Sequence, residues 1–219
     1  MDLNRSLILA HQLLVSGKID EAEKMLNEIL NLDPKNLHVL NNLGNICIEK
    51  KNFSKGITFF EKCLEINENF FQALANKGTC HQKLNQDVIA LECFEKTIKL
   101  NPNFIDIYYN IGNCFLKLDR YEEAILNYNK LIEKKPNFIN AIFNKALCYE
   151  KLENYNSAIE IYKKIIEIKK DFFLAHLHLG NCFKNIYSFE NAINSYKKAI
   201  EINTKFKSAA KYNLGCLQL

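Results

Sequence analysis

Apolar and small residues recur along this chain with the spacing of amphipathic helices. In residues 105–138 they are Ile107, Tyr108, Ile111, Gly112, Cys114 and Phe115, followed by Ala124, Tyr128, Leu131 and Ile132. Steps of three and four residues place each of these two runs on one face of a helix. The short segment 118–120 separates the runs. The pattern therefore predicts two helices joined by a tight connection.

The same pattern returns every 34 residues, and several residue types keep this interval. The clearest series are Phe70, Phe104, Phe138, Phe172, Phe206; Cys80, Cys114, Cys148, Cys182, Cys216; and Pro34, Pro102, Pro136. Six repeats follow, at residues 3–36, 37–70, 71–104, 105–138, 139–172 and 173–206. We number positions within each repeat from 1 to 34. Residues 207–219 predict one further helix, which either caps the stack or begins a truncated seventh repeat.

The repeat resembles the tetratricopeptide repeat, which has Gly at position 8, Ala at 20, an aromatic residue at 24 and Pro at 32. Residues 3–206 carry the resemblance, and repeat four matches most fully. Small residues at positions 8 and 20 would let the two helices of a repeat approach closely. The resemblance implies an all-α fold, a right-handed superhelix or solenoid of six helix pairs plus a C-terminal helix. It also implies that the first helix of each pair lines a concave groove.

Composition and charge narrow the function classes. The net charge is +4 and the pI is about 8.5, below the range above about 9 that is typical of nucleic-acid-binding modules. No stretch approaches the ~18 apolar residues of a membrane span. The apolar segment 7–15 is interrupted by His11 and Gln12 and aligns with the first helix of the other repeats. We therefore expect an intracellular protein, cytoplasmic or nuclear, whose partners include neither nucleic acid nor membrane.

No catalytic or cofactor motif is present in the sequence, such as a phosphate-binding glycine loop or HExxH. The chain is therefore expected not to be an enzyme and to need no cofactor. Cysteines at position 10 are expected to be free, buried thiols, because equivalent positions on successive repeats are too far apart for a disulfide. His178 and Cys182 are four residues apart but belong to different helix faces, so no metal site is predicted.

The candidate binding residues share one face of the first helix, at positions 2, 6, 9 and 13, with position 5 beside it. Position 6 carries the asparagine row, which we define as Asn42, Asn76, Asn110 and Asn144, with His178 at the equivalent place in repeat six. The other candidates are Asn45, Asn113 and Asn181 at position 9, Tyr109 and Phe143 at position 5, and Lys83, Lys117 and Lys151 at position 13. An asparagine amide can donate to and accept from a peptide group at once. The row resembles that of the repeat domain of O-GlcNAc transferases, although it could equally be a solvated face.

These features predict a scaffold that binds an extended peptide segment, or a helix, of a partner protein in the concave groove. An alternative is that the chain is the substrate-recruiting region of a larger enzyme, such as a glycosyltransferase with its catalytic domain elsewhere. A third possibility is self-association through the C-terminal end. Positions 2 and 6 are never Lys or Arg, so the clamp by which related co-chaperones hold a C-terminal carboxylate is not expected.

Overall fold

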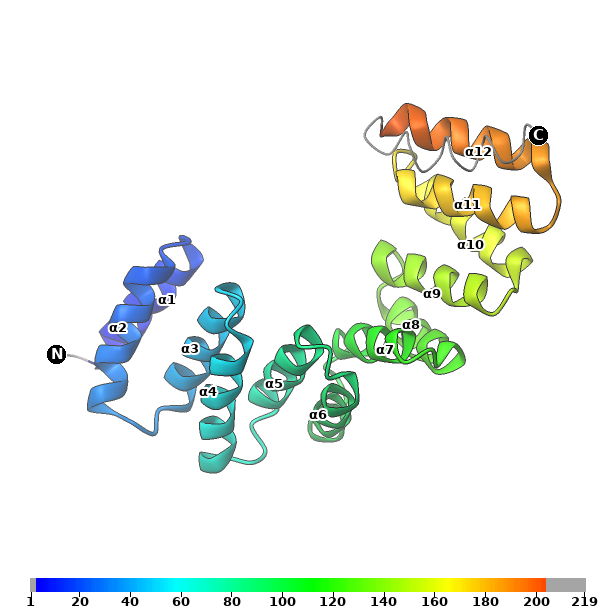
Figure 1. Cartoon of the computed structure of the whole chain (residues 1–219). Helices are drawn as coiled ribbons and strands as arrows, with labels where there is room; N and C mark the ends of the chain where they lie inside the picture. The colour runs from blue at the N-terminus through cyan, green and yellow to red at the C-terminus, as the bar shows by residue number, and fades with distance from the viewer. Residues whose placement is uncertain (1–2, 204–219) are drawn as a thin grey trace. The chain divides into compact units, whose positions relative to one another are not determined.

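The computed structural model describes residues 3–203, which form twelve α-helices and no strand (Figure 1). The helices are α1 (Leu3–Val15), α2 (Ile19–Leu32), α3 (Leu37–Glu49), α4 (Phe53–Ile66), α5 (Phe71–Lys83), α6 (Asp87–Leu100), α7 (Ile107–Lys117), α8 (Tyr121–Lys134), α9 (Ile139–Lys151), α10 (Tyr155–Ile168), α11 (Phe173–Asn185) and α12 (Phe189–Ile202). Each predicted repeat therefore contains one helix pair, which confirms the all-α fold. The predicted thirteenth helix, residues 207–219, lies outside the described residues.

A left-handed residue at position 15 joins the two helices of each repeat. Gly17 has φ 76°, and the equivalent Lys51 and Glu153 have φ 58° and 57°. After α3, the Asn52 N–H donates to the Cys47 carbonyl at 2.8 Å and the Lys51 N–H donates to that of Ile48 at 2.9 Å. These bonds satisfy carbonyls that the end of a helix leaves unpaired. The Asn52 side chain then caps α4 by accepting from the Lys55 N–H at 3.3 Å.

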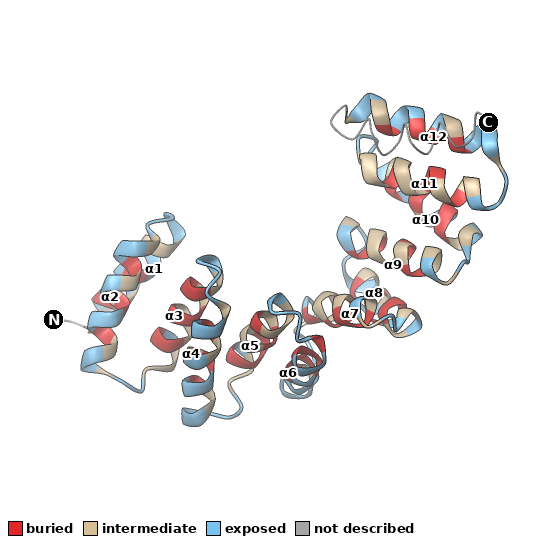
Figure 2. Cartoon of the chain, in the orientation of Figure 1, coloured by how far each residue is buried: buried red, intermediate tan, exposed pale blue. Residues whose placement is uncertain are grey.

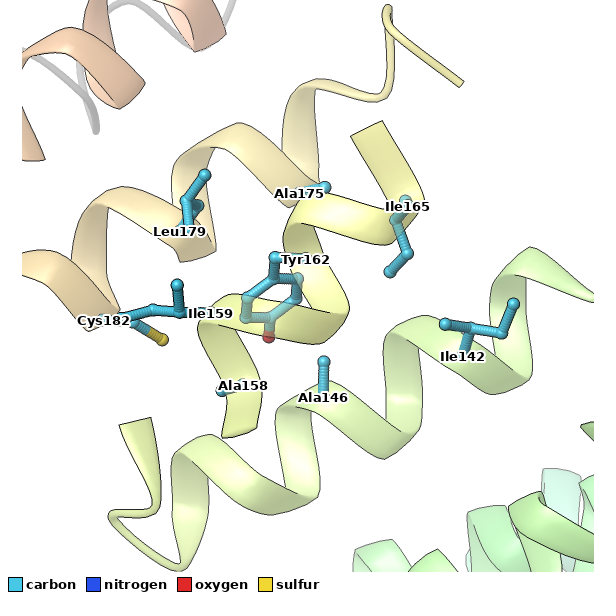
Figure 3. Packing of buried hydrophobic residues seen from close by; sticks show 9 residues of the cluster. All are labelled: Ile142, Ala146, Ala158, Ile159, Tyr162, Ile165, Ala175, Leu179 and Cys182. Atoms are coloured by element: carbon cyan, nitrogen blue, oxygen red, sulfur yellow. The ribbon is translucent and has the colours of Figure 1, made fainter. Parts of the chain in front are cut away.

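The chain divides into two compact units, Met1–Asn110 and Ile111–Leu219. Within each unit, buried residues line the helix faces that meet, while the opposite faces are exposed (Figure 2). In the first unit, Leu26 and Ile29 of α2 pack with Val39 and Leu43 of α3. In the second, Ala146 of α9 lies opposite the fully buried Tyr162 of α10, beside Leu179 of α11 (Figure 3).

The glycines at position 8 are required by close helix contact rather than by backbone conformation. A Cβ on Gly78 would lie 2.5 Å from the ring of Phe94, which is completely buried. The same ring contact occurs at Gly44 with Phe60 and, at 2.5 Å, at Gly180 with Tyr196. The packing reason given for small residues at position 8 is therefore confirmed.

The seven cysteines among the described residues are free and buried, which includes the four expected at position 10; Cys216 lies outside the described residues. Burial raises the pKa of the Cys80, Cys148 and Cys182 thiols to about 12. These groups are therefore protonated at neutral pH and behave as small apolar side chains. None of the helices in residues 3–203 is long and apolar enough to cross a membrane.

Candidate peptide-binding groove

A cavity of about 450 Å³ lies between α1 and α3 in the first unit. Its lining residues are Leu7, Ile8, His11, Gln12, His38 and Asn42. They occupy positions 5, 6, 9 and 10 of repeat one and positions 2 and 6 of repeat two, which is the face that the sequence assigns to binding. Ile8 is 61% exposed, so an apolar surface is open to solvent beside the Asn42 amide.

Sequence reasoning identified Asn42 but missed Ile8. Ile8 stands at position 6, where four of the six repeats have asparagine, and the helical pattern alone assigns it no more than a place in the first helix. The available signal was an apolar residue at a position that is polar in every other repeat. This replacement makes the repeat-one end of the face apolar, whereas the following repeats present amides.

In the first unit, the Asn76 amide links α5 to α3. Its Nδ2 donates to Asn45 Oδ1 at 2.9 Å and to Asn41 Oδ1 at 3.1 Å. Both N–H groups of this amide are therefore used within the protein, and its carbonyl oxygen alone is left to accept from a ligand. Asn45, which was predicted to contact a ligand, contributes the acceptor oxygen of this inter-repeat bond.

Asn42 and Asn110 differ from Asn76 in their surroundings. Within residues 3–203, neither side-chain amide has a hydrogen-bond partner, although the main-chain oxygen of Asn110 accepts from Gln82 Nε2 at 3.0 Å. The residue at position 9 of the preceding repeat explains the difference. Asn76 is preceded in this sense by Asn45, whose amide oxygen can accept from it. The corresponding residues are His11 for Asn42 and Thr79 for Asn110. The Thr79 hydroxyl donates to the Ala75 carbonyl at 3.0 Å. Asn42 and Asn110 are thus the two members of the row whose half-buried side-chain amides make no hydrogen bond within residues 3–203.

In the second unit, Asn113 accepts two hydrogen bonds at its Oδ1. Asn144 Nδ2 donates to it at 2.8 Å, and the buried Tyr128 hydroxyl donates to it at 2.8 Å. Asn144 therefore repeats the arrangement of Asn76, with its amide directed to position 9 of the preceding repeat. At repeat six, the Tyr196 hydroxyl donates to Asn181 Oδ1 at 2.9 Å.

Repeat five has Leu147 at position 9 in place of asparagine, and Glu150 at position 12 is the hydrogen-bond acceptor there. Glu150 Oε2 accepts from the Tyr162 hydroxyl at 3.0 Å and lies 2.9 Å from His178 Nδ1. Burial and the negative charge of Glu150 raise the pKa of Tyr162, which keeps the phenol protonated as a donor. His178, predicted as a ligand contact, is thereby bound to its neighbouring repeat.

The predicted apolar anchors and lysines lie in different environments. The Phe143 ring packs edge-on against Phe172 and His178, each at a centroid distance of 5.4 Å, so part of its surface is used in helix packing. Tyr109 is half-buried. The lysines at position 13, Lys83, Lys117 and Lys151, are exposed at the C-terminal ends of α5, α7 and α9.

His178 and Cys182 do not form a cluster, since His178 contacts Glu150 and Cys182 is completely buried. In the part of the chain that the structure describes, no group of three or more His, Cys, Asp and Glu side chains could hold a metal ion.

Among solved structures, this chain is similar to several repeat proteins. The crystal structure of YrrB, described as a TPR protein with an unusual peptide-binding site, has a TM-score of 0.75 at 18% identity and covers 89% of this chain and 98% of that one. MamA from Desulfovibrio magneticus RS-1 has a TM-score of 0.74 at 20% identity, covering 78% and 97%. The C-terminal part of a TPR repeat-containing protein from Cytophaga hutchinsonii has a TM-score of 0.78 at 17% identity, covering 94% and 82%. At these identities the likeness concerns the fold.

Sequence comparison gives the family directly. No curated protein matches the sequence significantly. Profiles of the tetratricopeptide repeat match residues 37–70, 71–104, 105–138, 139–172 and 174–206, which coincide with repeats two to six to within one residue. Together they cover most of the chain. The protein belongs to the tetratricopeptide repeat family.

Proposed function

We propose that this protein is a protein-interaction scaffold that binds an extended peptide segment of a partner along the first helices of its repeats. Membership of the tetratricopeptide repeat family supports the scaffold role. The observation that carries the proposal is the open cavity between α1 and α3, where the exposed apolar Ile8 lies beside an amide without an internal partner, that of Asn42.

The two available amides cannot supply enough binding energy by themselves. Asn42 and Asn110, with two hydrogen bonds each at about 0.5–1.5 kcal/mol, contribute about 2–6 kcal/mol. Association costs about 4–15 kcal/mol. An apolar side chain of the partner, buried in the cavity beside Ile8, adds about 1.5–3 kcal/mol. The cavity therefore adds to the affinity and fixes the register of the peptide, and the amides hold the peptide backbone.

The asparagine row as a whole has a divided role in this proposal. Asn42 and Asn110 bind the ligand, while Asn76 and Asn144 use donors to hold neighbouring repeats together. This differs from a row in which every amide serves a peptide, as the resemblance to O-GlcNAc transferases implies. The exposed Lys83, Lys117 and Lys151 would favour acidic residues in the bound segment. The comparisons lend no support to the alternative in which the chain recruits substrates for a catalytic domain.

A cytoplasmic or nuclear location remains part of the proposal and is supported by the free, buried cysteines. Self-association through the C-terminal end concerns residues outside those described and stays a prediction.

The test is peptide selection followed by matched substitutions. Peptides selected from a random extended library by the whole protein are synthesised, and their affinities are measured by calorimetry. Ile8→Gln is expected to weaken binding about tenfold and Asn42→Ala about fivefold, because they remove an apolar contact and peptide hydrogen bonds. Val88→Gln is the control, since Val88 is 59% exposed on α6, outside the cavity. Equal effects of Ile8→Gln and Val88→Gln, with unchanged circular dichroism, would contradict the proposal.

A further inference from the structure

A second cavity, of about 490 Å³, opens between α4 and α6 in the first unit. Its walls include Leu64, Glu68, Leu74, Lys96, Lys99 and Leu100. The second helices of repeats two and three supply most of these residues, and Leu74 of α5 lies between them. The asparagine row lies on the first helices, so this cavity is not part of the proposed groove.

The charge around this cavity departs from the pattern of the other repeats. Position 26 is lysine in repeats two to six, and position 29 is glutamate in repeats two, four, five and six, as Glu65, Glu133, Glu167 and Glu201. In repeat six, the position-26 lysine, Lys198, forms an ion pair with Glu201 at 2.7 Å. Repeat three has Lys99 at position 29, so its position-26 lysine, Lys96, has a second cation one turn away where the other four of these repeats have a glutamate.

The lysines therefore border apolar surface without being neutralised. Lys96 and Lys99 are exposed, and neither forms an ion pair with any acid among the described residues. Leu74 is 7% exposed and Leu100 is 41% exposed, which provides an apolar floor and an apolar edge. A ligand that fits must combine an apolar group with an adjacent negative charge.

The remaining wall favours a peptide over a simple fatty anion. Glu68 and Asn69, in the loop between α4 and α5, also line the cavity. Glu68 can accept from peptide N–H groups, and Asn69 can both donate to and accept from them. The alkyl chain of a fatty anion would instead cover the Glu68 carboxylate and the Asn69 amide without forming hydrogen bonds to them, which is unfavourable.

We propose that this cavity is a second docking site, which binds a partner segment carrying one leucine-like side chain flanked by aspartate or glutamate. The apolar side chain enters between Leu64, Leu74 and Leu100. The acidic residues pair with Lys96 and Lys99. The scaffold would then hold two different segments, one on its first helices and one between its second helices.

The experiment uses the whole protein labelled with ¹⁵N and an unlabelled peptide with a central leucine and two aspartates on each side. Titration followed by NMR is expected to shift the amide signals of Asn69 and Leu100 and to give a dissociation constant. Replacing the leucine of the peptide by alanine, or its aspartates by asparagine, should weaken binding at least about fivefold. Raising the salt concentration should weaken it as well.

Variants of the protein distinguish this site from general attraction of acidic peptides. Lys99→Glu, which restores the acid found at position 29 elsewhere, should weaken binding about tenfold, and Leu100→Ala about threefold. The matched controls are Lys164→Glu and Ile168→Ala, at positions 26 and 30 of repeat five, and should change affinity less than about twofold.

Three results would overturn the proposal. The first is equal weakening by Lys99→Glu and Lys164→Glu, and the second is an absence of shifts at the cavity with the wild-type protein. The third is decanoate binding more tightly than the peptide with the same sensitivity to Lys99→Glu, which would assign the cavity to an aliphatic anion. Because none of these variants touches the α1–α3 cavity, failure here is distinguishable from failure of the proposed groove.

Discussion

At the scale of single residues, buried phenols and the acceptors beside them determine which polar groups remain available. Position 24 is tyrosine in the last three repeats, and Tyr128, Tyr162 and Tyr196 are completely buried. Each hydroxyl donates to the first helix of its own repeat, to Asn113, Glu150 and Asn181 respectively. A buried hydroxyl without a partner is costly, so tyrosine at position 24 requires a polar residue at position 9 or 12.

This requirement predicts unequal effects of removing the hydroxyls. Tyr162→Phe leaves the charged Glu150 without one of its donors and should lower the free energy of unfolding by about 1.5–3 kcal/mol. Tyr128→Phe removes a bond to a neutral amide, so about 0.5–1.5 kcal/mol is expected. Tyr155→Phe, on the same helix as Tyr162, is the control, because no hydrogen bond to its hydroxyl occurs in residues 3–203. Urea denaturation measures all three, and a Tyr162→Phe effect no larger than that of Tyr155→Phe would contradict the explanation.

At the scale of helices, the approach distance within each pair depends on position 8. The glycine on the first helix faces a buried ring on the second, as in Gly78 and Phe94. Repeat five has Ala146 at this position and still packs against the buried ring of Tyr162 (Figure 3). The two helices of repeat five therefore leave room for a methyl group that the pairs with glycine do not.

Replacing a glycine by alanine should therefore destabilise the protein where a buried ring faces the glycine, and not where the space is open. Alanine favours a helix over glycine by about 1 kcal/mol, yet in Gly78→Ala the new Cβ would lie 2.5 Å from the Phe94 ring. We expect a net loss of about 1–3 kcal/mol in the free energy of unfolding, as for other overpacked cores. In Gly56→Ala the nearest atom is Cys80 Sγ at 3.2 Å, and other repeats have alanine at this position 20. Thermal and urea unfolding should show Gly56→Ala to be the more stable variant, and the reverse order would refute the packing argument.

The sequence was sufficient to predict the helices and their short connections, but not the backbone conformation of those connections or the hydrogen bonds of the asparagine row. The 34-residue period places all twelve helices, because apolar spacing and small residues depend on each repeat alone. The left-handed conformation at position 15 was not predicted: Gly17 hints at it, but Lys51, Glu153 and Tyr187 adopt it too. The side-chain hydrogen bonds of Asn76 and Asn144 depend on the residue at position 9 of the preceding repeat. Comparing only position 6 of each repeat does not reveal these bonds.

At the scale of the molecule, contacts run mainly between helices that are consecutive in the chain. Within each unit, the helices of one repeat pack together, and the second helix packs against the first helix of the next repeat, as α4 does with α5 and α10 with α11. In such a stack, stability is close to a sum over repeats and the interfaces between neighbours. The contact between α2 and α3 is smaller than that between α4 and α5, so repeat one should separate from repeat two more easily than repeat two separates from repeat three.

The buried thiols allow the opening of individual repeats to be measured, because each of repeats two to six contains at least one buried cysteine. Labelling requires opening of the helix pair. Cys47 lies on α3, which packs against α2, whereas Cys80, whose pKa burial raises to about 12, lies on α5, which packs against α4. We expect native-state labelling of Cys47 to be about tenfold faster than that of Cys80, with the rates resolved by mass spectrometry of the labelled peptides.

In denaturant the two rates should converge, which controls for intrinsic reactivity. Identical native rates at both thiols would mean that the unit opens only as a whole, and local separation of repeats one and two would then be too rare to affect the proposed cavity between α1 and α3.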